Sequence, residues 1–326
     1  MTTKDKKDEY TKFASGIFVV KSLNGNFNSN FSGTPRQLPD EEGTIYATDK
    51  ALKYCIRKYL LENGDSPIFA WRRRTEEGIF FKIDETYNYL FSSNEDELLK
   101  NSNKLKILKN LISCKDVRLF GVTFAPEETG KNISITGPVQ ISYGINKAKG
   151  NDFFTNQILS PFNPKSKQQT TIGDESKAIE VHYVYDFLVN PNHLNLNLEW
   201  TSMDEKDWEK FNQSDMNCFV EAICKGVNCV NSTTKIGSEG ELLLLVEHTD
   251  PVMIQNLKEF ISFRKENNKT VIILSDVLDY LKRNISNLDI KLYYDPVKTE
   301  IDFGEKNVDI REFNILNLEE INESEQ

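Results

Sequence analysis

The chain has 326 residues, of which 38% are hydrophobic and 28% are charged, and its formal net charge is −10. This length accommodates two average domains or one large β-rich domain, with enough apolar material for a buried core. The negative net charge argues against a generic nucleic-acid binder, because phosphate binding needs basic residues gathered locally. Such a gathering occurs between Lys50 and Arg74, whereas the segment after Asp295 is acidic.

Several sequence features that would indicate a membrane, a secreted or a zinc-binding protein are absent. No run of about 18 apolar residues occurs, so we expect no transmembrane helix and no membrane partner. The first residues have no apolar stretch of a secretory signal, and a cytoplasmic protein is expected. Five scattered cysteines without a C-x-x-C spacing predict reduced thiols and no zinc site.

The first third of the chain predicts a strand, a long loop and a helix. Residues 16–22 are typical of a central strand, and residues 23–43 are rich in Gly, Asn, Ser and Pro. That loop either binds a sugar–phosphate chain through its Asn side chains and backbone N–H groups or is a mobile surface loop. Thr48 predicts a helix N-cap, and Asn63-Gly64 predicts its end.

Basic residues on and after this helix leave two interpretations open. Lys53 and Arg57 are four residues apart and share one helix face, either solvated or tracking phosphates beside the loop. Residues 66–84 predict a β-hairpin in which Trp71 stacks on a base or packs under an arginine fringe. Asn94 and Glu97 predict a capping box for a helix to about Ile112.

The middle of the chain predicts a second hairpin and then an insertion. Residues 116–124 alternate with a period of two and 133–141 resume that pattern, with a bulge or edge expected at Gly137-Pro138. On this reading Phe120 and Phe124 share one strand face, where packing in the core is the simpler role. Residues 143–177 predict an extended protrusion or a disordered insertion, and its basic residues are Lys147, Lys149, Lys165 and Lys167.

The last third alternates strands and helices. Strands are predicted at 180–189, 241–247, 271–274 and 290–294, and helices at 202–225, from Asp250-Pro251, and from Ser275. Without the insertions, the order is strand, helix, strand, strand, helix, strand. This order predicts an α+β fold, a ferredoxin-like, RRM-like β-α-β-β-α-β palm with large finger and thumb insertions. The expected boundaries are a disordered N-terminus over 1–13, one palm domain over 14–315 with insertions at about 64–113 and 143–178, and an acidic solvated tail over 316–326.

No catalytic motif is present. The three histidines, His182, His193 and His248, are far apart, and a satisfied strand residue is expected at His182. The sequence has no phosphate-cradling glycine loop, no H-E-x-x-H and no calcium-loop spacing. We therefore expect no enzyme activity, no metal and no cofactor.

Several separated motifs, in order, carry a family resemblance. They are an Asn/Gly loop ending in Thr34-Pro35-Arg36, T-D-x-x-L-K-x-x-I-R from Thr48 to Arg57, D-V-R-L-F-G from Asp116, T-G-P-V-Q from Thr136, and N-P-N at Asn190–Asn192. Over residues 16–248 the chain resembles the backbone subunit of the type I-B Cascade surveillance complex, a CRISPR-associated protein of the RAMP superfamily. The resemblance implies a filament of neighbouring copies along one CRISPR RNA, with other Cascade subunits, pairing with target DNA through the guide.

The resemblance also implies RNA contacts at particular positions. Lys53 and Arg57 resemble phosphate contacts, and Gln140 lies near the groove. The remaining candidates are Asn24, Asn26, Asn28 and Arg36 in the first loop, and Lys147 and Lys149 in the insertion. The first loop lacks the aspartate with which type III relatives cut target RNA, which favours a non-cutting role. Two alternatives stay open: a guide-processing endoribonuclease of the same superfamily, and a structural oligomer without nucleic acid.

Overall fold

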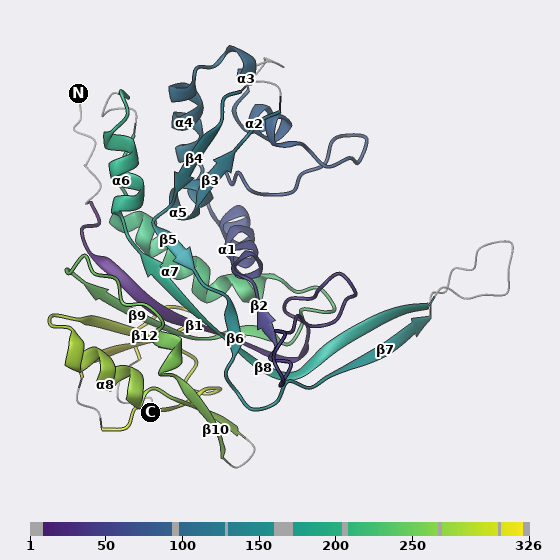
Figure 1. The fold of residues 1–326 in the computed structure, drawn as a ribbon, viewed down its shortest axis with the longest axis vertical. Helices are drawn as coiled ribbons and strands as arrows, with labels where there is room; N and C mark the ends of the chain where they lie inside the picture. Colours follow the sequence, from purple (N-terminus) through teal and green to yellow (C-terminus); the bar gives the residue numbers. More distant parts are fainter. Residues whose placement is uncertain are drawn as a thin grey trace, which may run out of the picture.

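The computed structural model describes residues 9–92, 98–127, 130–159, 172–203, 208–266, 269–305 and 308–321. Within them, a nine-stranded sheet forms the centre of the molecule (Figure 1). Its strands follow the order β14-β12-β9-β1-β8-β6-β2, and β5 and β7 also pair with β8. Their bounds are β1 Phe13–Gly25, β2 Tyr46–Ala47, β5 Val139–Ile141, β6 Gly144–Asn146, β7 Phe153–Leu159, β8 Ile172–Val189, β9 Ser238–His248, β12 Asp289–Tyr294 and β14 Ile310–Asn314.

The predicted ferredoxin-like unit lies in the middle of this sheet. β1 pairs antiparallel with β8 on one side and with β9 on the other, and β5 and β6 pair antiparallel with β8. The two crossover helices are α1 (Asp49–Asn63) and α7 (Gln213–Gly226), which contact each other. The order β1, α1, β5/β6, β8, α7, β9 confirms the predicted α+β fold class.

The sheet has a hydrophobic core on each face. Because strand side chains alternate, Phe18 and Val20 pack with Leu52 and Phe219 under α1 and α7, whereas Ile17 and Val19 face the other way. On that other face lie α8 (Ser275–Asn284) and a small sheet of β10 (Ser262–Glu266), β11 (Lys269–Ile273) and β13 (Glu300–Asp302). RRM domains bind bases on an open sheet face. Here both faces of the sheet are covered, so neither is open to a base.

The hairpin predicted around residues 116–141 is partly wrong. Residues Lys115–Phe120 form a short helix, α5, and only β3 (Gly121–Phe124) pairs with β4 (Ile133–Thr136). Every residue from Asp116 to Phe120 is buried, so the apolar spacing reflects packing on all sides rather than two strand faces. Phe120 and Phe124 therefore do not share a strand face. The single strand predicted over 133–141, with a bulge or edge at Gly137-Pro138, is also wrong, because β4 ends before these residues and β5 begins after them in another sheet.

Three further predictions were wrong in detail. Residues 66–84 contain one bridge, Arg74 with Phe80, and α2 (Ile83–Phe91) follows. The helix predicted from Ser202 begins instead at Gln213, where Asn212 and Asp215 form the capping box, and α6 (Asn192–Glu199) precedes it. The segment after Asp250 forms only a 3-10 turn, Leu257–Glu259, because the local Pro signal is not followed by a repeating apolar face.

Other predictions fall at the edges of the described chain. Asn94 and Glu97 lie outside the described residues, and the helix expected there appears as α3 (Leu98–Asn101) and α4 (Lys104–Ser113), capped by Asn103. Lys165 and Lys167 also lie outside them. The described part of the insertion forms an extended two-stranded ribbon of β7 and β8, which projects from the body (Figure 1).

The packed chain extends somewhat beyond the expected palm boundaries. Tyr10 is buried and donates its hydroxyl to Glu247 at 2.7 Å. Near the other end, Phe313 bridges to Glu320, and Ile321 packs against the core below α8. Both contacts tie the ends to the central sheet, at β9 and β14.

Candidate nucleic-acid interface

The first loop is held to the start of α1 by its asparagines. The Asn28 side-chain oxygen accepts hydrogen bonds from the backbone and hydroxyl of Thr48, at 3.0 and 3.2 Å. Thr48 in turn caps α1 by accepting from Ala51 at 3.3 Å. Asn26 is buried, and its amide donates to the carbonyls of Gly33 and Ser176. These two predicted RNA contacts are therefore engaged in shaping the loop.

Asn24 and Arg36 differ from Asn26 and Asn28 because their side chains are not held by hydrogen bonds that shape the loop. Asn24 is exposed, and its backbone adopts a left-handed conformation with φ of +50°. Arg36 is half-buried, its buried Nε has no hydrogen-bond partner, and no carboxylate of the described chain pairs with it. A buried guanidinium N–H without an acceptor is costly, and the negative charge of a phosphate nearby would offset part of that cost.

Lys53 and Arg57 lie together, but each is paired with a carboxylate. The Lys53 ammonium lies 3.3 Å from Asp49, and the Arg57 Nε lies 3.1 Å from Asp116. Both cations also lie over the Phe120 ring, 5.3 Å from its centroid. Burial lowers the pKa of Lys53 despite its acidic partner. Their role as phosphate contacts stays a prediction, and it now requires a phosphate to exchange with a carboxylate.

Asp116 and Arg118 of the D-V-R-L-F-G motif connect secondary-structure elements that are distant in the sequence. The Asp116 carboxylate accepts from the backbone N–H groups of Phe69 and Ala70, at 2.8 and 2.9 Å, besides holding Arg57. Arg118 binds Asp215 at the start of α7, at 2.5 and 3.2 Å. Sequence separations of 46 to 97 residues hide these partners from pattern analysis.

A pair of tyrosines at the β2–β6 edge was missed by the sequence analysis. Tyr46 on β2 stacks on Tyr143, with ring centroids 5.7 Å apart, and Tyr143 is 47% exposed. The Tyr46 backbone N–H donates to the Arg36 backbone carbonyl, so the two tyrosines lie beside the backbone of Arg36. Lys50, with a side chain 79% exposed, follows on the first turn of α1. The mixture of aromatic and basic residues on one edge is the only signal that could have indicated this pair.

The remaining predicted RNA contacts also divide into residues that already have a partner and one that has no acidic partner. Gln140 on β5 donates to the Gly137 carbonyl at 2.8 Å, and Lys147 pairs with Glu259 at 2.9 Å. Lys149 is exposed, and no carboxylate in the described chain pairs with it. Arg36 and Lys149 are thus the candidate cations without an acidic partner.

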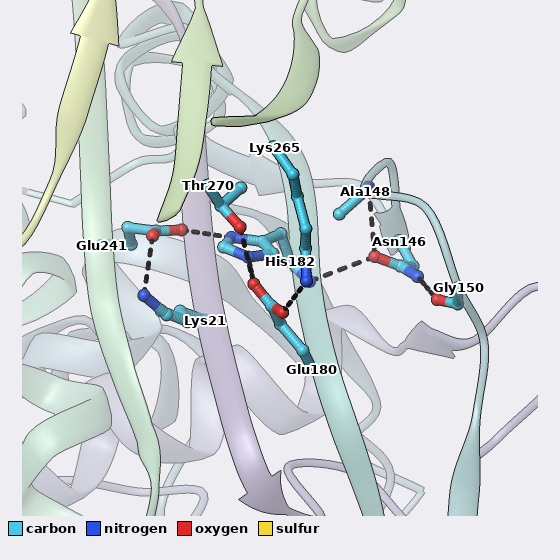
Figure 2. A network of polar contacts seen from close by, with 9 residues as sticks. All are labelled: Lys21, Asn146, Ala148, Gly150, Glu180, His182, Glu241, Lys265 and Thr270. Carbon is cyan, nitrogen blue, oxygen red and sulfur yellow. Dashed lines mark hydrogen bonds and ion pairs between the residues drawn. The ribbon is translucent and has the colours of Figure 1, made fainter. Parts of the chain in front are cut away.

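His182 forms the centre of a buried polar network, as Figure 2 shows. Its Nδ1 lies 2.5 Å from Glu241 on β9, and its Nε2 lies 3.2 Å from Glu180. Glu180 also accepts from Lys265 and Thr270 of the small sheet. Burial alone would raise the pKa of Glu180, but the hydrogen bonds from Lys265, Thr270 and His182 outweigh it and lower the pKa to about 2. This confirms the expectation that His182 is a satisfied strand residue, and the network ties the small sheet to the palm.

The described ranges contain neither a metal-binding cluster nor a membrane-spanning helix. No group of three or more His, Cys, Asp or Glu residues there has the arrangement of a metal site. No helix among the described residues is long and apolar enough to cross a membrane.

Comparison with known proteins places the chain in a family. The family of the CRISPR-associated protein Cas7 matches residues 12–287. A chain of a solved "CRISPR RNA-guided surveillance complex" is 12% identical, covers 90% of this chain and 95% of its own length, and has a TM-score of 0.48. A chain of a "CRISPR RNA-guided surveillance complex, pre-nicking" is also 12% identical, with 93% and 96% covered and a TM-score of 0.49. No curated protein matches. Because the family match spans most of the sequence, the chain belongs to the Cas7 family of CRISPR-associated proteins.

Proposed function

We propose that this protein is a backbone subunit of a type I-B Cascade effector complex. Copies polymerise along one CRISPR RNA, hold its phosphates without regard to sequence, and present the guide for pairing with invader DNA, which is the logic of RNA-guided systems. The observation that carries the proposal is the family match over residues 12–287. Its partners are neighbouring copies and other Cascade subunits, it acts in the cytoplasm, and it needs no cofactor.

The RNA grip is assigned to the surface between the first loop and the β2–β6 edge. Arg36 and Lys149 are the candidate cations there without acidic partners, and Tyr143 offers a half-exposed ring. The candidate cations Lys53, Arg57 and Lys147, by contrast, are already paired with carboxylates. A phosphate chain therefore gains most from the unpaired cations, because it displaces no existing partner.

The proposed role is non-catalytic. Residues 24–30 of the first loop include no aspartate. The ring nitrogens of the three histidines contact the carboxylates of Glu180 and Glu241 or the backbone carbonyls of Gly137 and Asp250. The competing function is that of a guide-processing endoribonuclease. Incubation of the purified protein with CRISPR repeat RNA separates the two, because our proposal expects intact RNA and the alternative expects discrete products.

The test of RNA binding uses residues whose loss should spare the fold. We expect the protein to co-purify with RNA, recognised by its 260/280 nm absorbance ratio and identified as CRISPR RNA by sequencing. Replacing Arg36 and Lys149 with Ala removes two predicted phosphate contacts, and the slope of log K against log salt should become shallower by about 1.4 for a single strand.

A matched control changes two cations on α8, far from the proposed surface. Lys282 and Arg283 are exposed in the last turn of that helix, and their double Ala variant should bind RNA with an unchanged salt slope. Absence of nucleic acid in the purified protein would support the structural oligomer instead. Equal slopes for both double variants would refute the assignment of the surface.

A further inference from the structure

The start of the first loop is also held by a turn from a distant part of the chain. Residues 231–237, which we call the support turn, lie between α7 and β9. The Leu23 N–H donates to the Gly237 carbonyl at 2.8 Å, and the Asn26 N–H donates to the Thr234 carbonyl at 2.6 Å. Gly237 permits this close approach, because its φ is +91° and a Cβ there would lie 2.2 Å from the Leu23 carbonyl oxygen. The support turn and the loop are thus in backbone contact.

Lys235 adds a side-chain contact from the support turn to the loop. Its ammonium donates to the Phe27 carbonyl and lies 5.5 Å from the centroid of the Phe27 ring. Lys235 is half-buried, burial lowers its pKa, and no carboxylate in the described part of the chain pairs with it. The carbonyl and the ring of Phe27 are therefore the groups that stabilise this cation.

The residue after Phe27 connects this contact to Arg36. The Asn28 carbonyl accepts from the Arg36 N–H at 3.3 Å, so two consecutive carbonyls of the loop bind Lys235 and the backbone of Arg36. Phe27 itself is 1% exposed and packs on Tyr183, with ring centroids 5.5 Å apart. Lys235 thus fixes the peptide next to the one that holds Arg36.

A direct phosphate contact is the competing role for Lys235. Its ammonium already has the carbonyl and ring of Phe27 as partners, and a phosphate would have to displace them. Arg36 has no carboxylate partner in the described chain, so it gives up nothing when it meets a phosphate. The contacts therefore favour a division of roles, in which Arg36 binds and Lys235 holds the loop.

We propose that Lys235 is a positioning residue for the RNA grip, which anchors the Phe27 carbonyl and thereby holds the Arg36 guanidinium where a phosphate reaches it. The proposal rests on the proposed function, because the group that is positioned is the candidate phosphate contact Arg36. It assigns part of the RNA affinity to the support turn, in which Lys235 lies 208 residues after Phe27.

The test is a double-mutant cycle in the binding of a labelled CRISPR RNA to the full-length protein. Lys235→Met keeps the length of the side chain and removes the ammonium, whereas Arg36→Ala removes the group that is positioned. We expect Lys235→Met to raise the Kd about tenfold in the wild-type background and to leave it within about twofold in the Arg36→Ala background. Lys235→Arg keeps N–H donors and should bring the Kd to within about threefold of the wild type.

A matched control separates positioning from a general loss of stability. Lys131 also donates to backbone carbonyls, those of Leu99 and Lys100, at 2.9 and 2.6 Å. Lys131→Met should leave the RNA Kd within about twofold of the wild type, since it removes a comparable contact away from the first loop. We expect Lys131→Met and Lys235→Met to have similar unfolding temperatures, so a difference in affinity between them cannot come from stability.

Trypsin cleavage of the first loop provides a readout that needs no RNA. Cleavage after Arg36 produces fragments of residues 1–36 and 37–326, and it requires the loop to open locally. In protein freed of nucleic acid, Lys235→Met should speed this cleavage about tenfold, whereas Lys131→Met should leave its rate unchanged.

Two results would overturn the proposal. An equal rise in Kd with and without Arg36 would make Lys235 an independent phosphate contact, and unchanged cleavage after Arg36 would show that Lys235 does not hold the loop. Failure of the proposed function looks different, because a wild-type protein that binds no CRISPR RNA would refute that function while the cleavage assay still reports on the anchor.

Discussion

The Arg118–Asp215 pair joins α5 to the start of α7, and we predict that Arg118→Ala destabilises the protein strongly. Arg118 is 8% exposed and makes four contacts, two with Asp215 and one each with the carbonyls of Glu209 and Lys210, both at 3.0 Å. Truncation removes all four at once. It also leaves the Asp215 carboxylate buried beside Lys115, at 2.8 Å, as its remaining cation.

Removing one partner of a buried ion pair costs about 3–5 kcal/mol, because the other charge stays buried. Lys115 and the capping N–H of Asn212 still stabilise Asp215, which places the expected loss near the lower end, at about 3 kcal/mol. Thermal unfolding of Arg118→Ala should therefore occur about 4 °C below the wild type. Arg283→Ala is the control, since its pair with Asp279 is exposed and 3.8 Å long, and a loss below about 0.5 kcal/mol is expected.

The pH dependence provides an independent check. Burial raises the pKa of Asp215, but Arg118 and Lys115 outweigh it and hold that pKa below its usual range. A depressed carboxyl pKa gives stability that is fully present above the unfolded value of about 3.9 and is lost as the pH falls through the folded value. The difference between wild type and Arg118→Ala should thus narrow below about pH 4. Unfolding of the variant at the wild-type temperature at pH 7 would refute this account.

Substitutions at Thr48, Gly121 and Glu180, with matched controls for the first two, test other contacts by thermal or urea unfolding. Thr48→Ala should cost about 1 kcal/mol through loss of the α1 cap, and Thr48→Ser should restore it. Gly121→Ala should cost about 3 kcal/mol, since Gly121 has a φ of +77° and a Cβ there would lie 2.1 Å from the Ile135 carbonyl oxygen. Gly78→Ala, at φ +84° in open space, should cost about 1 kcal/mol, and equal losses would contradict the role of that contact. The wild type should lose stability as the pH falls from about 4 to 2, because the Glu180 carboxylate, with its pKa lowered to about 2, becomes protonated over this range. Glu180→Gln has no carboxylate to protonate there, so its stability should fall less over the same range.

The palm could be predicted from the sequence because its signals are local. Continuous apolar runs mark β1 and β9, alternation of apolar residues marks β8, and Thr48 with Asn63-Gly64 marks both ends of α1. These signals depend on residues close together in the sequence, so they predict the element correctly without knowledge of its tertiary contacts. The small sheet under α8 was largely missed because β10 and β13 are short and mostly exposed, without an apolar alternation.

The candidate site was harder to predict, because its charges are set by distant residues. Lys53 and Arg57 share a face of α1, as the spacing predicts. Their charges are nevertheless balanced, in part by Asp116, 59 residues away from Arg57. Sequence spacing locates a side chain on its own helix but says nothing about the carboxylate that folding brings to it.

The motif that most suggested the family is therefore a poor place to look for RNA contacts. Asp116 and Arg118 are both buried and hold α1, α5 and α7 together, so their replacement would destabilise the fold and could reduce RNA binding without any lost phosphate contact. Loss of function in such variants cannot distinguish a phosphate contact from a structural joint. Arg36 and Lys149 lack carboxylate partners in the described chain, so their removal perturbs binding with little cost to the fold. A drop in RNA affinity at these positions, without a drop in unfolding temperature, is therefore what identifies a phosphate contact.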